Sequence, residues 1–303
     1  MGRLGSRARR RDVGKALTMT EWDIRVLGTA EELAAAEDLQ RMVWPGSEAD
    51  IVPVHLLLTA AHNGGLAAGA FVDDRLVGFV FGFPGLDTTV SPPRLKHCSH
   101  MLGVHSDFRG SGMGHALKCF QWQHVRQQGI ERVTWTYDPL LARNAQLNIC
   151  KLGAVCNTYL RNLYGDMRDG LNAGLPSDRF QVDWWVNSER VTARMTERPR
   201  PRRGLADHLT AGAAKINPSF ADEPASPPSV RPADWPEGPA LALQIPADFQ
   251  DLRARDLTLA LKWRLSTRAV FEELFDRGYL VSDFVYEAGP PPRAHYVLRP
   301  AGL

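Results

Sequence analysis

The segment Arg109-Gly-Ser-Gly-Met-Gly114 combines residue types that can bind a diphosphate. Glycines let the main chain take positive φ angles and approach a ligand closely. The stretch 97–104 before the segment is typical of a strand, and the stretch 112–128 after it is typical of an amphipathic helix. The first turn of such a helix presents unpaired N–H groups and the positive end of its dipole. With the fixed cation of Arg109, the segment predicts an anion-binding loop between a strand and a helix.

Several loop patterns compete for this segment. A Walker A loop ends in Gly-Lys-Ser/Thr, whereas this one ends in Gly114-His115-Ala116, so that pattern fails. The dinucleotide pattern G-x-G-x-x-G would need glycine where His115 stands, and it matches poorly. The remaining alternatives are a plain strand-to-helix turn and the pattern Arg/Gln-x-x-Gly-x-Gly/Ala, which Arg109, Gly112 and Gly114 match residue for residue.

That last pattern resembles the co-substrate loop of the GNAT acyltransferase superfamily. The resemblance covers about residues 22–164, and the stretch 144–154 is similar to the family's later helix, which ends in a Lys-Leu-Gly turn. The stretches 135–140, 164–167 and 171–179 are similar to a group of bacterial proteins predicted to be GNAT acetyltransferases. The resemblance implies acetyl-CoA or another acyl-CoA as co-substrate, no metal, and an amine of a small molecule or protein as acceptor.

The resemblance also implies which residues meet the co-substrate. The main chain near Gly103 is expected to bind the pantetheine arm, and the loop is expected to bind the phosphates. The full set expected at the co-substrate is Leu102, Gly103, Val104, Arg109, Gly110, Ser111, Gly112, Met113, Gly114, His115, Asn144 and Asn148.

Two side chains are candidates for acid–base catalysis. His100 lies near the middle of the expected co-substrate strand, and histidine has an ordinary pKa near 6.5. A hydrogen-bonded structural histidine is the alternative. Asp138 follows the next strand and is the second candidate, with a turn residue before Pro139 as its alternative. GNAT enzymes often have a tyrosine acid where this chain has Ile149. Tyr159 and Tyr164 could supply the missing acid from elsewhere in the chain.

The surrounding elements predict an α/β fold in which helices alternate with strands around a mixed sheet. The resemblance implies that this sheet is of the GNAT type, mostly antiparallel and flanked by helices. Thr29 and Glu32 form a capping-box pattern at the start of a helix that Trp44-Pro45-Gly46 ends. A second helix is expected over 54–62, a hairpin over 67–72 and 75–81, and a loop over 85–93. Further strands are expected over 97–104, 133–137 and 154–159, with helices over 112–128 and 144–151 between them.

Composition divides the chain into four parts. Residues 1–20 are expected to be a disordered basic tail, 21–195 the acyl-CoA-binding domain and 196–239 a proline-rich linker. Residues 240–303 are expected to form a strand–helix–strand–strand unit that packs on the first domain, since about 65 residues make a small independent core.

Charge and length narrow the function classes. The 303 residues are 44% hydrophobic and 23% charged, with a net charge of +2, so no strong field for nucleic acid or membrane is expected. No apolar run reaches the roughly 18 residues of a membrane helix. The four cysteines form no C-x-x-C pair, which favours a reducing cytoplasm over disulfides or structural zinc.

An acyltransferase is the first hypothesis. A non-catalytic acyl-CoA-binding module and a nucleic-acid-associated protein using the arginine-rich tail are the alternatives.

Overall fold

The computed structural model describes residues 22–46, 48–165, 174–196, 203–217 and 226–302, which form one 11-stranded sheet. The strand order is β1-β2-β3-β4-β5-β7-β6-β10-β11-β9-β8. The strands are β1 Asp23–Val26, β2 Leu66–Val72, β3 Arg75–Asp87, β4 Arg94–Val104, β5 Arg132–Tyr137, β6 Val155–Leu160, β7 Arg179–Trp185, β8 Ala213–Lys215, β9 Ala240–Ile245, β10 Tyr279–Glu287 and β11 Arg293–Pro300. Among these described strands, only the pairs β4–β5 and β8–β9 are parallel. The expected mixed, mostly antiparallel sheet is confirmed. The basic tail expected at 1–20 lies outside the described residues.

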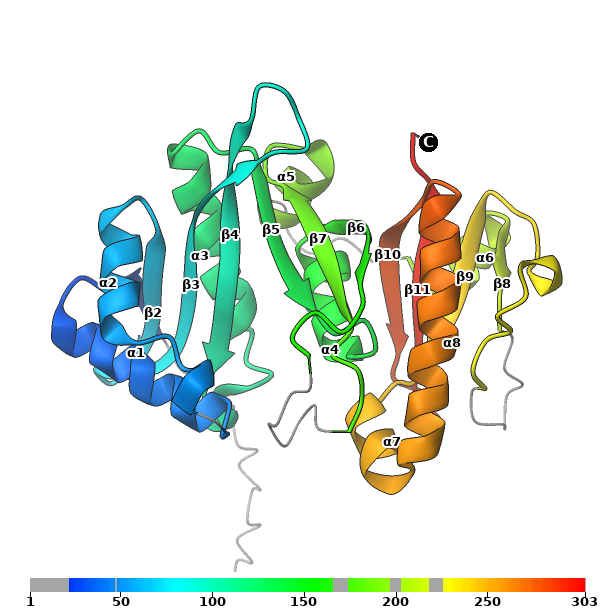
Figure 1. Cartoon of the computed structure of the whole chain (residues 1–303), viewed down its shortest axis with the longest axis horizontal. Helices are drawn as coiled ribbons and strands as arrows, with labels where there is room; N and C mark the ends of the chain where they lie inside the picture. Colours follow the sequence, from blue (N-terminus) through cyan, green and yellow to red (C-terminus); the bar gives the residue numbers. More distant parts are fainter. Residues whose placement is uncertain (1–21, 47, 166–173, 197–202, 218–225, 303) are drawn as a thin grey trace, which may run out of the picture.

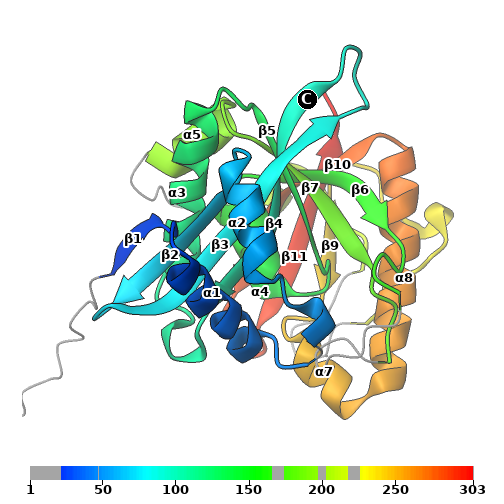
Figure 2. The same cartoon turned by 60° about the vertical axis from the view of Figure 1, so that its left-hand side comes forward.

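Helices cover both faces of the sheet. They are α1 Ala30–Val43, α2 Val54–His62, α3 Met113–Gln127, α4 Ala142–Ala145 with the π-helix Gln146–Lys151, α5 Glu189–Thr196, α6 Leu205–Thr210, α7 Phe249–Arg255 and α8 Leu257–Asp276. Short 3-10 turns occur at Glu48–Asp50, Ser106–Phe108 and Pro232–Asp234. On the first strands, α1 and α2 lie on one face and α3 on the other (Figures 1 and 2). No helix in the described part of the chain has the length and apolar character needed to span a membrane.

Local signals in the sequence explain the first elements. Thr29 accepts a hydrogen bond from the Glu32 amide and the Glu32 carboxylate accepts from the Thr29 amide, which is the expected capping box. Asp73 and Asp74 both have positive φ angles, as a two-residue hairpin turn requires. The loop expected over 85–93 begins too early, because β3 stays paired with β4 as far as Asp87. The connection ends at residue 93 as expected, and β4 begins at Arg94, three residues before the strand expected over 97–104.

The C-terminal unit has the expected strand–helix–strand–strand order, with α7 and α8 between β9 and β10. The segment 196–239 is more than a linker, because its described part contains α6 and β8, and β8 adds a parallel strand beside β9. Strand β7, whose residues alternate between buried and partly exposed, was not expected from the sequence. It lies between β5 and β6 and completes the central part of the sheet.

The hydrophobic cores do not follow the expected domain boundaries. One continuous core extends from Trp122 on α3 through β5 and β7 to Trp263 on α8 and Leu298 on β11. Two smaller cores lie on the two faces of β2 and β3. The C-terminal unit therefore shares its interior with the centre of the sheet and extends that sheet edge to edge.

Candidate functional site

Strands β4 and β5 separate soon after they pair. They are joined at only two positions, His97–Val133 and Cys98–Thr134, although β4 continues to Val104 and β5 to Tyr137. Figure 1 shows the two strands diverging toward their C-terminal ends. We call this interruption of the pairing, between residues 99–104 of β4 and 135–137 of β5, the split. Among the described residues no strand pairs with that edge of β4, so its main-chain groups are available to a ligand.

A β-bulge on β4 lies at the start of the split. Ser99 pairs with Gly82 and Met101 pairs with Phe81 on β3, so His100 between them is the additional residue. Bulges interrupt pairing and turn a side chain in a new direction. The side chain of His100 consequently lies beside Phe81, in the layer that α1 and α2 cover.

The glycine-rich loop follows the end of β4 directly. Gly110 and Gly112 have φ angles of +86° and +97°, which residues with a Cβ rarely adopt. Gly112 is the N-cap of α3, and the Ala116 amide bonds back to its carbonyl at 3.1 Å. A Cβ added at either glycine would meet no atom within 4 Å. The backbone conformation, and not packing, therefore requires glycine here, and the space in front of the helix N-terminus is open.

The rest of the loop contributes polar groups around that open space. Ser111 Oγ donates to the Phe108 carbonyl at 2.7 Å and accepts from the Met113 amide at 3.3 Å. Arg109 is exposed, and its Nε donates to the Val104 carbonyl at 3.3 Å, so the cation is tied to the end of β4. Helix geometry leaves the other first-turn amides, such as that of Gly114, without an acceptor inside the helix. The arrangement suits a diphosphate lying across the start of α3.

The expected strand residues of the co-substrate site border the split. Leu102 and Val104 turn their side chains toward the layer of α3, and Gly103 is buried on the other face, against Phe79 and against Trp44 at the end of α1. A Cβ at Gly103 would come within 2.6 Å of the Phe79 ring, so packing on that side already requires glycine. A ligand in the split could therefore bind the main-chain groups of these three residues.

His100 is exposed, and its ring lies 6.1 Å from the rings of both Phe81 and Phe83. Partial burial of the imidazole lowers the pKa of His100 below its ordinary value, so the ring is neutral at pH 7 although part of the side chain is exposed. A neutral imidazole can accept a proton. The geometry therefore allows the role of base that the sequence suggests for His100.

Asp138 has a different environment from the one expected of a base. Its carboxylate accepts two hydrogen bonds from Arg264 of α8, at 2.8 and 2.5 Å, and one from the Leu140 amide at 2.8 Å. Arg179 lies 4.0 Å away, and Asp138 is 7% exposed. Both oxygens are occupied, so the carboxylate holds α8 against the end of β5. The interpretation of Asp138 as a catalytic residue is corrected accordingly.

The helix at 142–151 has no acid at position 149, where the resemblance led us to look for a tyrosine. Ile149 is fully buried in the core, and Asn148 beside it is 5% exposed. Asn144 is half-buried on the preceding turn. Tyr159 donates its hydroxyl to Asp178 at 2.7 Å, and burial raises the pKa of Tyr159 well above its ordinary value. That tyrosine is a structural group and not a free acid.

Tyr164 occupies a more suitable place. Its hydroxyl lies 2.9 Å from Thr136 Oγ1 on β5, and the residue is 52% exposed. Because Trp135 faces α3, strand alternation turns Thr136 to the opposite face of the sheet. His100 lies on that same face, across the split. An exposed imidazole and an exposed phenol therefore border the split from its two sides.

A buried polar cluster, which was not expected, lies on the other face where the strands separate. Lys118 of α3 is 2% exposed, and its Nζ donates to Ser99 Oγ at 2.8 Å and to Gln121 Oε1 at 2.9 Å. Nζ also lies 3.8 Å from the centre of the Trp135 ring. The sequence carried a signal, because Lys118 and Gln121 share the helix face of Met113, Leu117 and Val125, where apolar residues are the rule.

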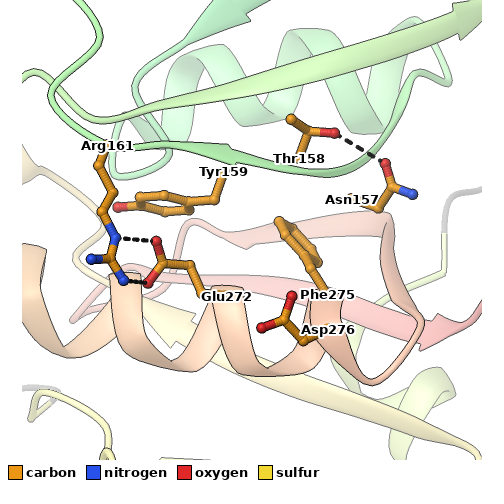
Figure 3. Close-up of a pocket in the computed structure, with 7 residues that line it drawn as sticks. All are labelled: Asn157, Thr158, Tyr159, Arg161, Glu272, Phe275 and Asp276. Carbon is orange, nitrogen blue, oxygen red and sulfur yellow. Dashed lines mark hydrogen bonds and ion pairs between the residues drawn. The ribbon is translucent and has the colours of Figure 1, made fainter. Parts of the chain in front are cut away.

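A surface pocket lies between β6 and α8 (Figure 3). None of the residues that line it belongs to β4 or β5, so it is separate from the split. It measures about 510 Å³, and Arg161 and Glu272 form an ion pair at its edge with distances of 2.5 and 2.6 Å. Tyr159 and Phe275 line it from β6 and α8. Within the described ranges, no group of three or more His, Cys, Asp or Glu side chains could hold a metal ion.

Comparisons with known proteins find structural similarity without sequence similarity. No family model and no curated protein sequence matches the chain. Among solved structures, the ribosomal-protein-S18-alanine N-acetyltransferase from Escherichia coli is similar at 17% identity over 55% of this chain and 96% of its own, with a TM-score of 0.43. A GNAT-family acetyltransferase from Streptococcus pneumoniae is similar at 15% identity over 54% and 98%, with a TM-score of 0.43. An aminoglycoside 6′-acetyltransferase type Ii is similar at 19% identity over 59% and 99%, with a TM-score of 0.42.

Proposed function

We propose that this chain transfers an acetyl or other acyl group from acyl-CoA to an amine of a small molecule or protein. The observation that carries the proposal is the split between β4 and β5, which leads directly to a glycine loop at the N-terminus of α3. The split offers unpaired main-chain groups to an extended arm, and the loop offers amides and a cation to phosphates. One ligand with both features is a coenzyme A thioester.

In this proposal the phosphates bind at the loop without a metal. The amide of Gly114 and the positive end of the α3 dipole face the diphosphate, and Arg109 supplies a charge. The pantetheine arm adds to the unpaired edge of β4 from Val104 back toward Ser99. The thioester then lies near the bulge at His100, where main-chain N–H groups can stabilise the developing oxyanion by about 3–4 kcal/mol each.

The reaction is a direct attack in a ternary complex. The acceptor's amine nitrogen forms a bond with the thioester carbonyl carbon, and the carbon–sulfur bond breaks to release CoA as a thiolate. His100 takes the proton that the amine nitrogen loses, and Tyr164 gives a proton to the thiolate. Both side chains then exchange protons with solvent. Holding donor and acceptor side by side supplies much of the acceleration.

A non-catalytic acyl-CoA-binding module is the second candidate. The buried Ile149, at the family's usual tyrosine position, and the occupied carboxylate of Asp138 favour it. The two candidates share the binding step and differ in whether a product forms.

Two measurements test the proposal in sequence. Calorimetry with EDTA present should show coenzyme A binding to the full chain, because the loop amides and Arg109 need no metal ion beside them. Mass spectrometry after incubation with acetyl-CoA and a metabolite extract should then show acylated amines. Absence of coenzyme A binding overturns both candidates, and binding without any acylated product supports the module.

A further inference from the structure

The polar cluster around Lys118 lies where β4 and β5 part. Cys98–Thr134 is the last pair between the two strands, and the next residues along each strand are Ser99 and Trp135. Lys118 Nζ contacts both, at 2.8 Å from Ser99 Oγ and 3.8 Å from the centre of the Trp135 ring. One side chain of α3 therefore joins the two strands just beyond their last main-chain pair.

Within the part of the chain that the structure describes, this ammonium contacts only neutral groups. Besides Ser99 and Trp135, its partner is Gln121 Oε1 at 2.9 Å, and the Trp184 ring on β7 is 5.6 Å away. Lysine is rarely buried fully without an acidic partner, because removing an ammonium from water costs free energy. Cation–π contact with a desolvated tryptophan offsets part of that cost. Burial lowers the pKa of Lys118 to about 7.

The neighbouring ionisable groups do not supply a counter-charge. On β4, His97 lies 3.1 Å from Gln121 Nε2, and burial together with the Lys118 and His124 charges lowers the His97 pKa to about 3. On α3, burial lowers the pKa of His124 as well. From β5 and β7, the contacts are the two tryptophan rings. Lys118 is thus the group of this cluster that changes charge near neutral pH.

We propose, on the basis of the acyl-CoA function proposed above, that Lys118 is a positioning residue for the pantetheine arm. Its ammonium fixes Ser99 and Trp135 on the two sides of the split and thereby fixes the β4 edge next to the bulge at His100. Lys118 lies on the α3 face and does not touch the reacting atoms. The loop that binds the phosphates lies one and a half turns earlier on α3 and does not depend on it.

The experiment compares two ligands on the full chain. S-ethyl-coenzyme A carries the arm and has no ionisable thiol, whereas adenosine 3′,5′-bisphosphate lacks the arm. In Lys118→Met, S-ethyl-coenzyme A should bind about tenfold more weakly, and the bisphosphate should bind as it does to the unsubstituted protein. Equal losses for both ligands, or no loss for either, would overturn the positioning role. Failure of the unsubstituted protein to bind S-ethyl-coenzyme A more tightly than the bisphosphate would instead overturn the proposed function.

The pH dependence separates the charge from the shape of the side chain. The affinity for S-ethyl-coenzyme A divided by that for the bisphosphate is taken relative to the same quotient in Lys118→Met, because the phosphate monoesters of the ligands themselves titrate at about pH 6. This ratio should fall as pH rises through about 7, when Lys118 loses its proton. Gln121→Glu places a carboxylate beside Nζ, so it should move the midpoint to higher pH. A ratio that does not change with pH in the unsubstituted protein, or an unmoved midpoint in Gln121→Glu, contradicts the role of the charge.

A folding control accompanies these variants. The folded-state pKa of Lys118, about 7, lies below the unfolded value near 10.4. The unfolded chain therefore binds more protons between these values, and the free energy of unfolding rises with pH across this window. Lys118→Met should lack that slope and should unfold no more easily than the unsubstituted protein at pH 7. Easier unfolding of Lys118→Met would contradict the view that the buried charge is a cost to stability.

Discussion

The sheet contains two parallel strand pairs, and they behave in opposite ways. The pair β4–β5 is interrupted after two residues, whereas β8–β9 stays joined through Ala213–Ala240, Ala214–Leu241 and Lys215–Ala242. The joining continues beyond β8, because the Ile216 amide donates to the Ala242 carbonyl at 3.0 Å. Asn217 then pairs with the main chain of Gln244, donating at 3.0 Å and accepting at 2.9 Å.

The surroundings of the two pairs are related. The strand order β4-β5-β7-β6 recurs in reverse as β10-β11-β9-β8, and β8 is parallel to β9 as β4 is parallel to β5. After each parallel pair the chain forms helices and then an antiparallel strand pair, β6–β7 after β5 and β10–β11 after β9. Between β4 and β5 the chain forms the glycine loop and the 15-residue α3. Between β8 and β9 its described part forms only the turn at Pro232–Asp234. A parallel pair becomes a candidate site when a bulge and a glycine-capped helix accompany it.

The largest expected effect tests whether His100, at the start of the split, takes part in catalysis. His100→Gln removes the proposed base, so turnover should fall by about 10²- to 10⁴-fold, while coenzyme A affinity stays near that of the unsubstituted protein. Steady-state rates and calorimetry on the same preparations measure the two quantities. His62→Gln, at the exposed end of α2, is the control and should change neither. Unchanged turnover in His100→Gln would remove His100 from the mechanism.

The second effect concerns the ion pair between Asp138, which follows β5, and Arg264 of α8 in the C-terminal unit. Asp138→Asn leaves Arg264 buried without its full counter-charge, and we expect the free energy of unfolding to fall by about 3–5 kcal/mol. Denaturant titration measures it. If Asp138 were instead a base, stability would stay and turnover alone would fall.

A double substitution sharpens the second effect. Asp138→Leu with Arg264→Met removes both charges, and apolar replacement of a buried pair is often neutral or stabilising. The double variant should therefore recover most of the stability that Asp138→Asn loses. If the double variant lost as much free energy of unfolding as the two single substitutions together, the ion pair would not be what joins α8 to the end of β5.

The third effect tests the loop that distinguishes β4–β5 from β8–β9. Gly114 has an ordinary φ, and a Cβ there would meet only Leu102 and Val104 side chains at 3.8 and 3.9 Å. Gly114→Val should therefore fold, yet it should collide with a bound diphosphate and weaken coenzyme A binding by about 1–3 kcal/mol, or roughly 5- to 150-fold. Calorimetry measures the change. Normal affinity in a folded Gly114→Val would mean that the diphosphate binds elsewhere.

The two ends of α3 provide a matched control for this loop. Gly112 and Gly129 both have positive φ angles, +97° and +71°, and both face open space. Alanine at either position should cost a similar, small amount of stability, on the order of 1 kcal/mol. Only Gly112→Ala should also lower coenzyme A affinity. Equal effects of the two variants on affinity would assign the loss to strain in the helix.

Patterns local in sequence predicted much of this fold. The capping box at Thr29, the turn at Asp73-Asp74 and the glycine loop each depend on residues a few positions apart, and the structure has all three elements. Strand β7 was missed because the stretch 179–185 mixes charged and aromatic residues, and its place depends on β5 and β6 at its sides.

Long-range partners explain where the expected site was wrong. Asp138 has the same local sequence whether it is free or paired, and Arg264, its partner, lies 126 positions away. Lys118 could have been noticed on the apolar face of its helix, but Ser99 and Trp135 become its neighbours only once β4 and β5 pair. The sequence was sufficient to predict a binding loop made of adjacent residues. The surroundings of a charged side chain such as Asp138 or Lys118 could be known only from the tertiary structure.

The smallest expected effect tests the strand pair β8–β9, which stays joined. Asn217→Ala removes two hydrogen bonds to the main chain of Gln244 and one, at 3.2 Å, to the Ser226 carbonyl. Because these groups are only partly buried, we expect a loss of about 1–2 kcal/mol in the free energy of unfolding. Coenzyme A should bind at one site per chain in both proteins, with the same affinity, because the β8–β9 pair lacks a glycine loop. Calorimetric stoichiometry decides the point: a second site in the unsubstituted protein, or one that appears in Asn217→Ala, would mean that strand separation alone makes a binding site and that the loop does not distinguish the two pairs.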